Sequence, residues 1–152
     1  MFPNTQDRSS IKGRVYIDVL YENGDTRRIV QDNVVTNNGR DRIAALISQS
    51  STTFPSHIAI GTGTTAVAVT DTAMETEVDR NALVATTDSS GVVSFKCFFG
   101  KTEANGSTIS EVGLFDAASS GTLICHAILG ATVVKDNTIS ITVTWTITFA
   151  DS

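Results

Sequence analysis

The amino-acid sequence predicts a mainly β protein, an antiparallel β-sandwich or open barrel with one short helix at about residues 39–50. Three observations support this fold class. The chain closes with a long alternating strand, shorter apolar runs are separated by turn residues, and 22 threonines accompany a charged fraction of only 18%. Threonine suits strands because its β-branched side chain fits a pleated, half-exposed surface.

The last predicted strand alternates without a break over residues 139–149. One face carries six apolar residues and the other carries hydroxyl residues: Ile139, Ile141, Val143, Trp145, Ile147 and Phe149 against Ser140, Thr142, Thr144, Thr146 and Thr148. A period of two over this length predicts an extended strand, about 36 Å long, with one buried face. The pattern therefore places Trp145 in the core.

Turn residues divide the remainder of the chain into strands. Asn23-Gly24 predicts a hairpin turn between strands at residues 11–20 and 26–35, because Asn-Gly tolerates positive φ angles. Residues 61–78 form a long loop with room for a helical turn near residues 73–78. The other predicted strands are 57–60, 79–87, 92–101, 109–115 and 122–129.

One segment has helical periodicity. An asparagine N-cap precedes residues 40–50, in which Ile43, Leu46 and Ile47 form an apolar stripe. Arg40 and Arg42 lie off this stripe, so we expect both to face water.

Length and composition indicate a flexible N-terminal arm at residues 1–10 and a single β domain at residues 11–152. The net charge is −5 and no basic run occurs, which argues against direct nucleic-acid binding. The sequence has neither a signal-peptide pattern nor 18 consecutive apolar residues, so we expect synthesis in a cytosol and no membrane partner. Cys97 and Cys125 lie in apolar runs and are expected to be buried thiols rather than a disulfide.

No set of residues matches a catalytic or cofactor motif. Gly61-Thr62-Gly63 lacks the lysine of a phosphate loop and the third glycine of a dinucleotide fingerprint, so we interpret it as a turn that needs two permissive glycines. His57 and His126 are the only histidines, and neither has a partner at zinc-ligand spacing. We expect no enzyme activity, no cofactor and no metal.

Four carboxylates cluster in the long loop: Asp71, Glu75, Glu77 and Asp79. Oxygen ligands of this kind could bind Ca²⁺, but the spacing and central glycine of an EF-hand are absent. The plainer interpretation is a solvated acidic loop.

Four segments, taken together and in order, resemble the attachment domains of tailed-bacteriophage tail fibres and tail-collar fibre proteins. Residues 33–39 resemble the pattern N-x-x-T-N-x-G, and residues 57–65 resemble h-x-A-h-G-T-G. Residues 75–80 resemble E-x-x-R, and residues 103–116 resemble G-x-x-I-x-E-h-G-L-F-D. The resemblance covers about residues 30–149 and implies a structural β domain of a virion. Fibres of the family usually continue into a shaft and a receptor-binding tip, whereas this chain stops at the predicted strand.

These observations lead to one functional hypothesis with two alternatives. The first is a non-enzymatic, homo-oligomeric virion subunit that docks on the tail, collar or baseplate, among other virion proteins assembled in the host cytoplasm. The alternatives are a decoration protein on the capsid exterior and a carbohydrate-binding adhesion module. The expected subunit interface comprises Phe2, Thr142, Thr144, Thr146 and Thr148. The threonines have a simpler explanation as the solvent face of a sheet, since such faces are normally polar.

Overall fold

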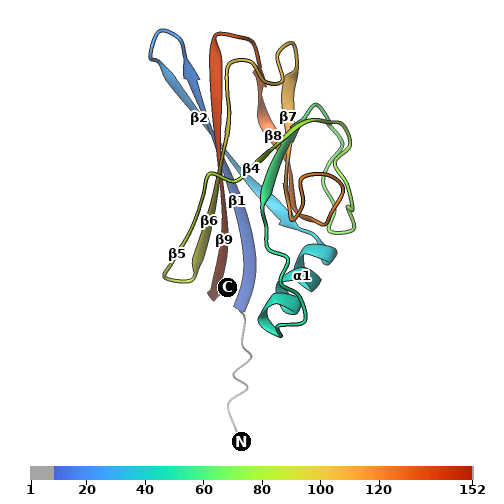
Figure 1. The fold of residues 1–152 in the computed structure, drawn as a ribbon. Coiled ribbons are helices and arrows are strands. Elements are labelled where there is room, and N and C mark those ends of the chain that lie inside the picture. The colour runs from blue at the N-terminus through green and yellow to red at the C-terminus, as the bar shows by residue number, and fades with distance from the viewer. Residues whose placement is uncertain (1–8, 152) are drawn as a thin grey trace, which may run out of the picture.

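A computed structural model describes residues 9–151, which form nine strands and one helix (Figure 1). The strands account for most of the chain, as the sequence predicts. Their bounds, with that of the helix, are β1 (Ser9–Tyr21), β2 (Thr26–Val35), α1 (Asn37–Ile47), β3 (His57–Gly61), β4 (Glu77–Ala82), β5 (Ala85–Ser89), β6 (Val92–Phe99), β7 (Thr108–Phe115), β8 (Leu123–Val134) and β9 (Ile139–Asp151).

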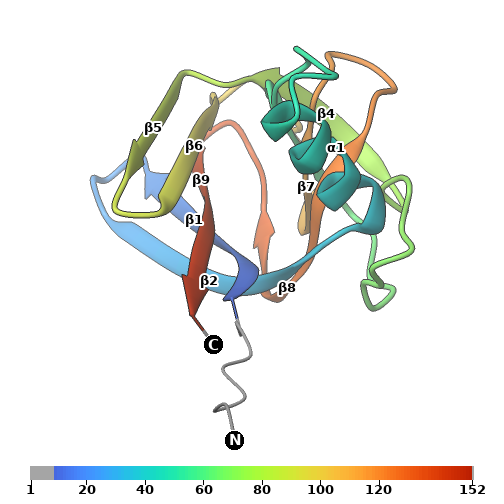
Figure 2. The same ribbon diagram turned by 90° about the horizontal axis from the view of Figure 1, so that it is seen from below.

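All nine strands belong to one antiparallel sheet with the order β4-β3-β7-β8-β2-β1-β9-β6-β5. The sheet curls into a half-barrel, seen from one end in Figure 2. Its two edge strands, β4 and β5, are neighbours in sequence and are joined by only Leu83 and Val84. This short connection brings the two edges of the sheet together, so the fold is an open barrel with one helix.

The predicted hairpin is present and has the expected turn. β1 and β2 pair antiparallel, and Gly24 in the turn has a φ of 90°. The Gly24 N–H donates to the Tyr21 carbonyl over 2.9 Å, while the Asn23 side chain accepts from the Asp25 N–H. The Asn-Gly pair therefore fixes the register of the first two strands.

β9 is the central strand of this half of the sheet. It pairs with β1 from Ser9↔Asp151 to Tyr21↔Ile139 and with β6 on its other side. Its apolar side chains enter the core, where Trp145 is fully buried and its Nε1 donates to Asn33 Oδ1 over 3.2 Å. Phe149 departs from the prediction: it is 44% exposed, because the sheet passes the end of the packed core before that residue.

The helix lies three residues earlier than predicted, and its N-cap is Thr36 rather than an asparagine. The Thr36 hydroxyl accepts from the Gly39 N–H over 2.9 Å and donates to the Leu123 carbonyl over 2.5 Å. A residue distant in sequence thus fixes where the helix begins. The helix ends at Ile47, and Gln49 beyond it has a positive φ of 61°.

The predicted strand at residues 79–87 is divided into β4 and β5. β4 pairs with β3 at one edge of the sheet, whereas β5 pairs with β6 at the other edge. At the crossing the Leu83 N–H donates to the Ser56 carbonyl and the Val84 N–H donates to the Lys96 carbonyl. The helical turn near residues 73–78 is also absent, since residue 77 already begins β4.

β1 begins at Ser9, two residues before the predicted boundary between arm and domain. The rest of the expected arm, including Phe2, lies outside the described residues. Within residues 9–151, no helix is long and apolar enough to cross a membrane.

Cys97 and Cys125 are free thiols, and both are fully buried. Burial raises the pKa of Cys97 to about 11 and that of Cys125 to about 12. We predict that neither thiol reacts with a disulfide reagent at pH 8 in the native protein and that two react per chain in denaturant.

The same pKa shifts predict a loss of stability in alkali. Between pH 9 and 11 the unfolded thiols ionise while the folded ones stay protonated, so the free energy of unfolding falls as pH rises. Urea titrations at pH 8 and 10 measure this difference. Rapid reaction of the native thiols at pH 8 would contradict the burial of both residues.

Candidate functional site

A buried carboxylate, Glu111 on β7, organises one end of the sheet. Glu111 is fully inaccessible to solvent. One oxygen, Oε2, accepts from the N–H groups of Gly63 and Thr76 over 3.1 and 3.0 Å. The other, Oε1, accepts from the Glu75 N–H over 2.6 Å. Glu111 therefore holds both ends of the loop between β3 and β4, because Gly63 follows β3 and Glu75 and Thr76 precede β4.

His126 on β8 lies between two carboxylates. Its Nε2 is 2.7 Å from Glu111 Oε1, and its Nδ1 is 2.7 Å from Asp71 Oδ2. An ionised carboxylate only accepts hydrogen bonds, so both contacts are satisfied together when both ring nitrogens carry a proton. The histidine thus links the β7–β8 pair to the middle of the loop.

Gly61 and Gly63 are required for space rather than for unusual φ angles, which corrects the interpretation from sequence. Neither glycine has a positive φ. A Cβ at residue 61 would overlap the Thr76 carbonyl oxygen, and one at residue 63 would overlap the Glu111 carboxylate. The two glycines let the loop close tightly over Glu111.

The four acidic residues all accept specific hydrogen bonds, while Glu75 and Glu77 stay exposed as expected. Asp71 binds His126, and Glu75 Oε2 accepts from the N–H groups of Thr64 and Thr65 over 2.9 and 2.8 Å. Those two hydrogen bonds, with Thr65 first, hold the pKa of Glu75 below its usual range. Glu77 pairs with Arg80 over 2.6 Å. Among residues 9–151, no group of three His, Cys, Asp or Glu side chains is arranged to hold a metal ion.

Two arginines connect neighbouring segments to this unit. The Arg80 guanidinium lies 3.6 Å from the centroid of the Phe115 ring and donates to the carbonyls of Ala117 and Ser120. Arg42 is half-buried with its Nε 2.9 Å from Asp116 Oδ2, so the expectation that it faces water is wrong. Arg40 is exposed as predicted.

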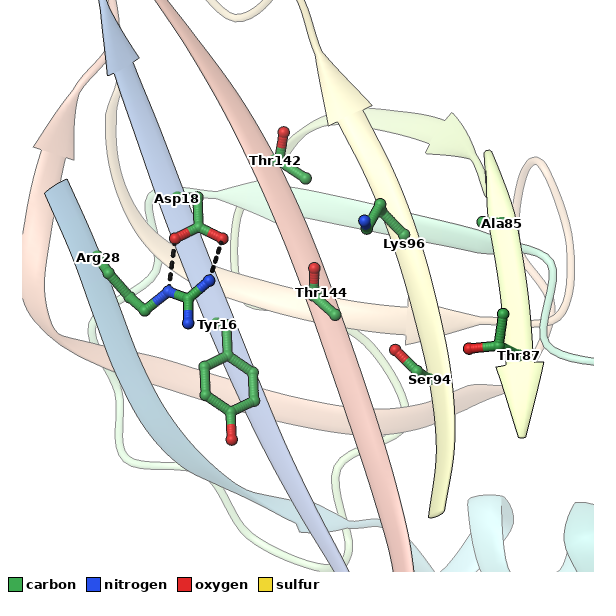
Figure 3. Close-up of a pocket in the computed structure, with 9 residues that line it drawn as sticks. All are labelled: Tyr16, Asp18, Arg28, Ala85, Thr87, Ser94, Lys96, Thr142 and Thr144. Carbon is green, nitrogen blue, oxygen red and sulfur yellow. Dashed lines mark hydrogen bonds and ion pairs between the residues drawn. The ribbon is translucent and has the colours of Figure 1, made fainter. Parts of the chain in front are cut away.

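The threonines of β9 lie on the opposite, outward face of the sheet from Trp145. Thr144 is opposite Tyr16 on β1 and Lys96 on β6, and Thr146 is opposite Arg14 and Ser94. Figure 3 shows part of this face, an open depression of 390 Å³ whose residues come from β1, β2, β5, β6 and β9. We call this outward side of β2, β1, β9, β6 and β5 the threonine face.

The threonine face combines hydroxyl groups with paired charges and scattered apolar side chains. Arg28 forms two hydrogen bonds with Asp18, over 2.7 and 3.0 Å, and Arg14 binds Asp32 over 2.8 Å (Figure 3 shows the first pair). Leu20, Val30 and Phe98 are each about half exposed there. The two arginines are paired with carboxylates, whereas Lys12 and Lys96 on the same face have no ion-pair partner among the described residues.

The sequence-predicted interface is therefore partly assembled. Thr142, Thr144, Thr146 and Thr148 are brought together in one row, half-exposed, whereas Phe2 lies outside the described residues. Trp145 points the other way and is not available to stack on a sugar. Glu111, Arg80 and Asp116 were not predicted as site residues, and Arg42 was predicted only to face water. The sequence feature that could have identified Arg80, Glu111 and Asp116 is their position within the motif segments at residues 75–80 and 103–116. Arg42 lies in the helix that follows residues 33–36.

Comparison of the chain with protein-family models, with curated proteins and with solved structures found no match.

Replacement of Glu111 by glutamine tests the organising role of its carboxylate. We predict that Glu111→Gln lowers the free energy of unfolding by about 2–4 kcal/mol, because the amide nitrogen faces a buried N–H or His126 in place of an acceptor. The matched control is Glu22→Gln, at an exposed residue that lies 3.6 Å from Lys101, which should leave stability unchanged. Urea unfolding measures both. Equal stability of the two variants would contradict the role of Glu111.

Proposed function

We propose that this protein is a non-enzymatic structural subunit of a tailed-phage virion, which docks on the tail, collar or baseplate as an adaptor or fibre-attachment module. The observation that carries the proposal is spatial. Three of the four segments that resemble phage fibre-attachment domains, residues 57–65, 75–80 and 103–116, meet at Glu111. The fourth, residues 33–39, reaches the same unit through Val34, which pairs with His126 on β8.

Each segment contributes one part of this unit. Residues 33–39 supply the Thr36 cap, and residues 57–65 supply β3 and the close glycines. Residues 75–80 supply amides bound by Glu111 and the Arg80 side chain, and residues 103–116 supply Glu111 and Asp116. Because the segments build one local structure, their resemblance to phage fibre-attachment domains supports the proposal that this chain has the same type of domain.

The contacts of the charged groups support a structural role for them. Glu111, His126, Glu75 and Arg80 all bind protein partners. None of these groups is left to act as a nucleophile or a general base, so the proposal assigns them to holding the loop.

The threonine face is the proposed docking surface. Antiparallel sheets commonly leave one face to solvent, and this one offers a row of hydroxyl groups beside two paired arginines. An interface on it would bury Leu20, Val30 and Phe98 while the threonines form hydrogen bonds to the partner. The proposed partners are other virion proteins and further copies of this chain.

The test of this docking surface is to introduce arginine side chains in the middle of the threonine face. We predict that the double variant Thr144→Arg and Thr146→Arg folds normally but is depleted at least tenfold from purified particles, since two unpaired charges would be buried in the interface. The control is Thr108→Arg with Thr132→Arg, two exposed threonines on β7 and β8. Quantitative mass spectrometry counts the copies, and native mass measurement gives the oligomeric state.

Images of particles carrying a label on this protein decide where it docks. A label on the tail, collar or baseplate supports the proposal, and a label spread over the capsid exterior would replace it with capsid decoration. Absence of the wild-type protein from particles, together with a monomeric mass at high concentration, would contradict a virion role altogether.

A further inference from the structure

A lysine is fully buried at the end of β8. Lys135 follows that strand directly, and no part of the residue is accessible to solvent. Its Nζ donates to two acceptors, Asn105 Oδ1 and the Asp136 carbonyl, each over 2.9 Å. Within residues 9–151, no carboxylate forms an ion pair with this nitrogen. Lys135 is therefore a buried amine without a countercharge in contact.

These contacts favour the neutral form of the amine. An ammonium group has three N–H donors, and burying one of them without a partner is costly. A neutral amine has two N–H donors, which match the two acceptors, and it keeps a lone pair. Burial lowers the pKa of Lys135, while the charges of Asp136 and Glu103 oppose that shift. A lysine activated in this way is a nucleophile.

The side-chain amide of Asn105, in the turn before β7, lies against this amine. Its Nδ2 donates to the Lys101 carbonyl over 2.8 Å, so its Oδ1 is turned toward Lys135. The Gly106 N–H donates to the Lys135 carbonyl, and the Lys135 N–H donates to the Ser107 carbonyl, both over 2.9 Å. Because a C=O bond measures about 1.2 Å, the lysine nitrogen lies no more than about 4 Å from the Asn105 Cγ. A small rotation of the lysine end brings the two atoms to the roughly 3–3.5 Å of a near-attack geometry.

We propose that Lys135 and Asn105 form an intramolecular isopeptide bond, in one reaction of the chain on itself. The Nζ lone pair attacks Cγ of Asn105, so that a new C–N bond forms and the bond from Cγ to Nδ2 breaks. One proton moves from the attacking nitrogen to the departing nitrogen, which leaves as ammonia. The reaction balances without an oxidant or any other co-reactant. Asn105 is exposed, so the ammonia departs directly into water.

Glu103 is the group that carries this proton. Its carboxylate is held beside the same turn by Asn81 Nδ2, over 2.7 Å, and by the Gly100 N–H, over 2.5 Å. Its charge acts on Lys135. A carboxylate placed in this way accepts the proton from the attacking amine and returns it to the departing nitrogen, as a general base and then a general acid.

The isopeptide bond joins the turn before β7 to the end of β8 and closes a covalent loop between residues 105 and 135. A cross-link of this kind restricts the unfolded chain, as a disulfide does. It therefore braces a protein whose two cysteines are free. This inference does not depend on the virion role.

The intact mass of the purified full-length protein tests the proposal. We expect the wild-type chain to be lighter than its sequence by the mass of one ammonia. Asn105→Ala and Lys135→Arg should keep their full sequence masses, because each lacks one of the reacting groups. The matched control is Asn23→Ala, in the other hairpin turn with an Asn-Gly pair, and it should still lose ammonia. Glu103→Gln should form the bond at least tenfold more slowly.

Peptide mapping separates the isopeptide bond from a succinimide, which forms with the same loss of ammonia when the Gly106 nitrogen attacks Asn105. Trypsin does not cleave after an acylated lysine, so the wild-type chain should stay uncut between residues 135 and 136. Further cleavage at Phe115 with chymotrypsin should leave the pieces that carry Asn105 and Lys135 joined.

Three results would overturn the proposal. The first is a wild-type chain that keeps its full sequence mass after prolonged incubation at pH 8. The second is loss of ammonia with normal tryptic cleavage after Lys135, which would identify a succinimide. The third is loss of ammonia that persists in Asn105→Ala. An unchanged rate in Glu103→Gln would overturn the role of Glu103 as the proton carrier.

Discussion

One buried carboxylate, Glu111, fixes the course of the long loop between β3 and β4. Glu111 is inaccessible to solvent, yet its charge is compensated by three backbone N–H groups and by His126. Hydrogen bonds to a charged group are stronger than those between neutral groups, and an unpaired buried charge is strongly destabilising. The loop between β3 and β4 is long and rich in Thr and Ala, so it has few apolar side chains with which to pack itself. The loop takes a defined course because the Glu111 carboxylate accepts hydrogen bonds from three of its backbone N–H groups.

That constraint has consequences for the rest of the barrel. With the loop held, β4 begins at Glu77 beside β3, and the chain then crosses to β5 through Leu83 and Val84. The crossing joins the two edges of the curled sheet. One side of the sheet then carries the threonine face, and the open end beside α1 carries an apolar groove.

The predictions from sequence were accurate where neighbouring residues decide the structure. The Asn23-Gly24 hairpin and the last strand follow from local turn chemistry and from alternation, and both are present. The predictions were wrong where a distant residue decides. Thr36 caps α1 because it also bonds the Leu123 carbonyl, 87 residues away, and Arg42 turns inward because Asp116 lies beside it. The predicted strand at residues 79–87 has no internal signal for its break, which arises where the chain crosses from one edge of the sheet to the other.

By itself, the sequence determined the β class, the two faces of the final strand and the burial of Trp145, because alternation depends only on the two-residue period of an extended chain. Only the tertiary structure decided what Glu111 binds, since its partners come from three separate parts of the chain. It likewise decided that Phe149 leaves the core for a groove shared with α1, because contacts between distant elements leave no periodic trace in the sequence.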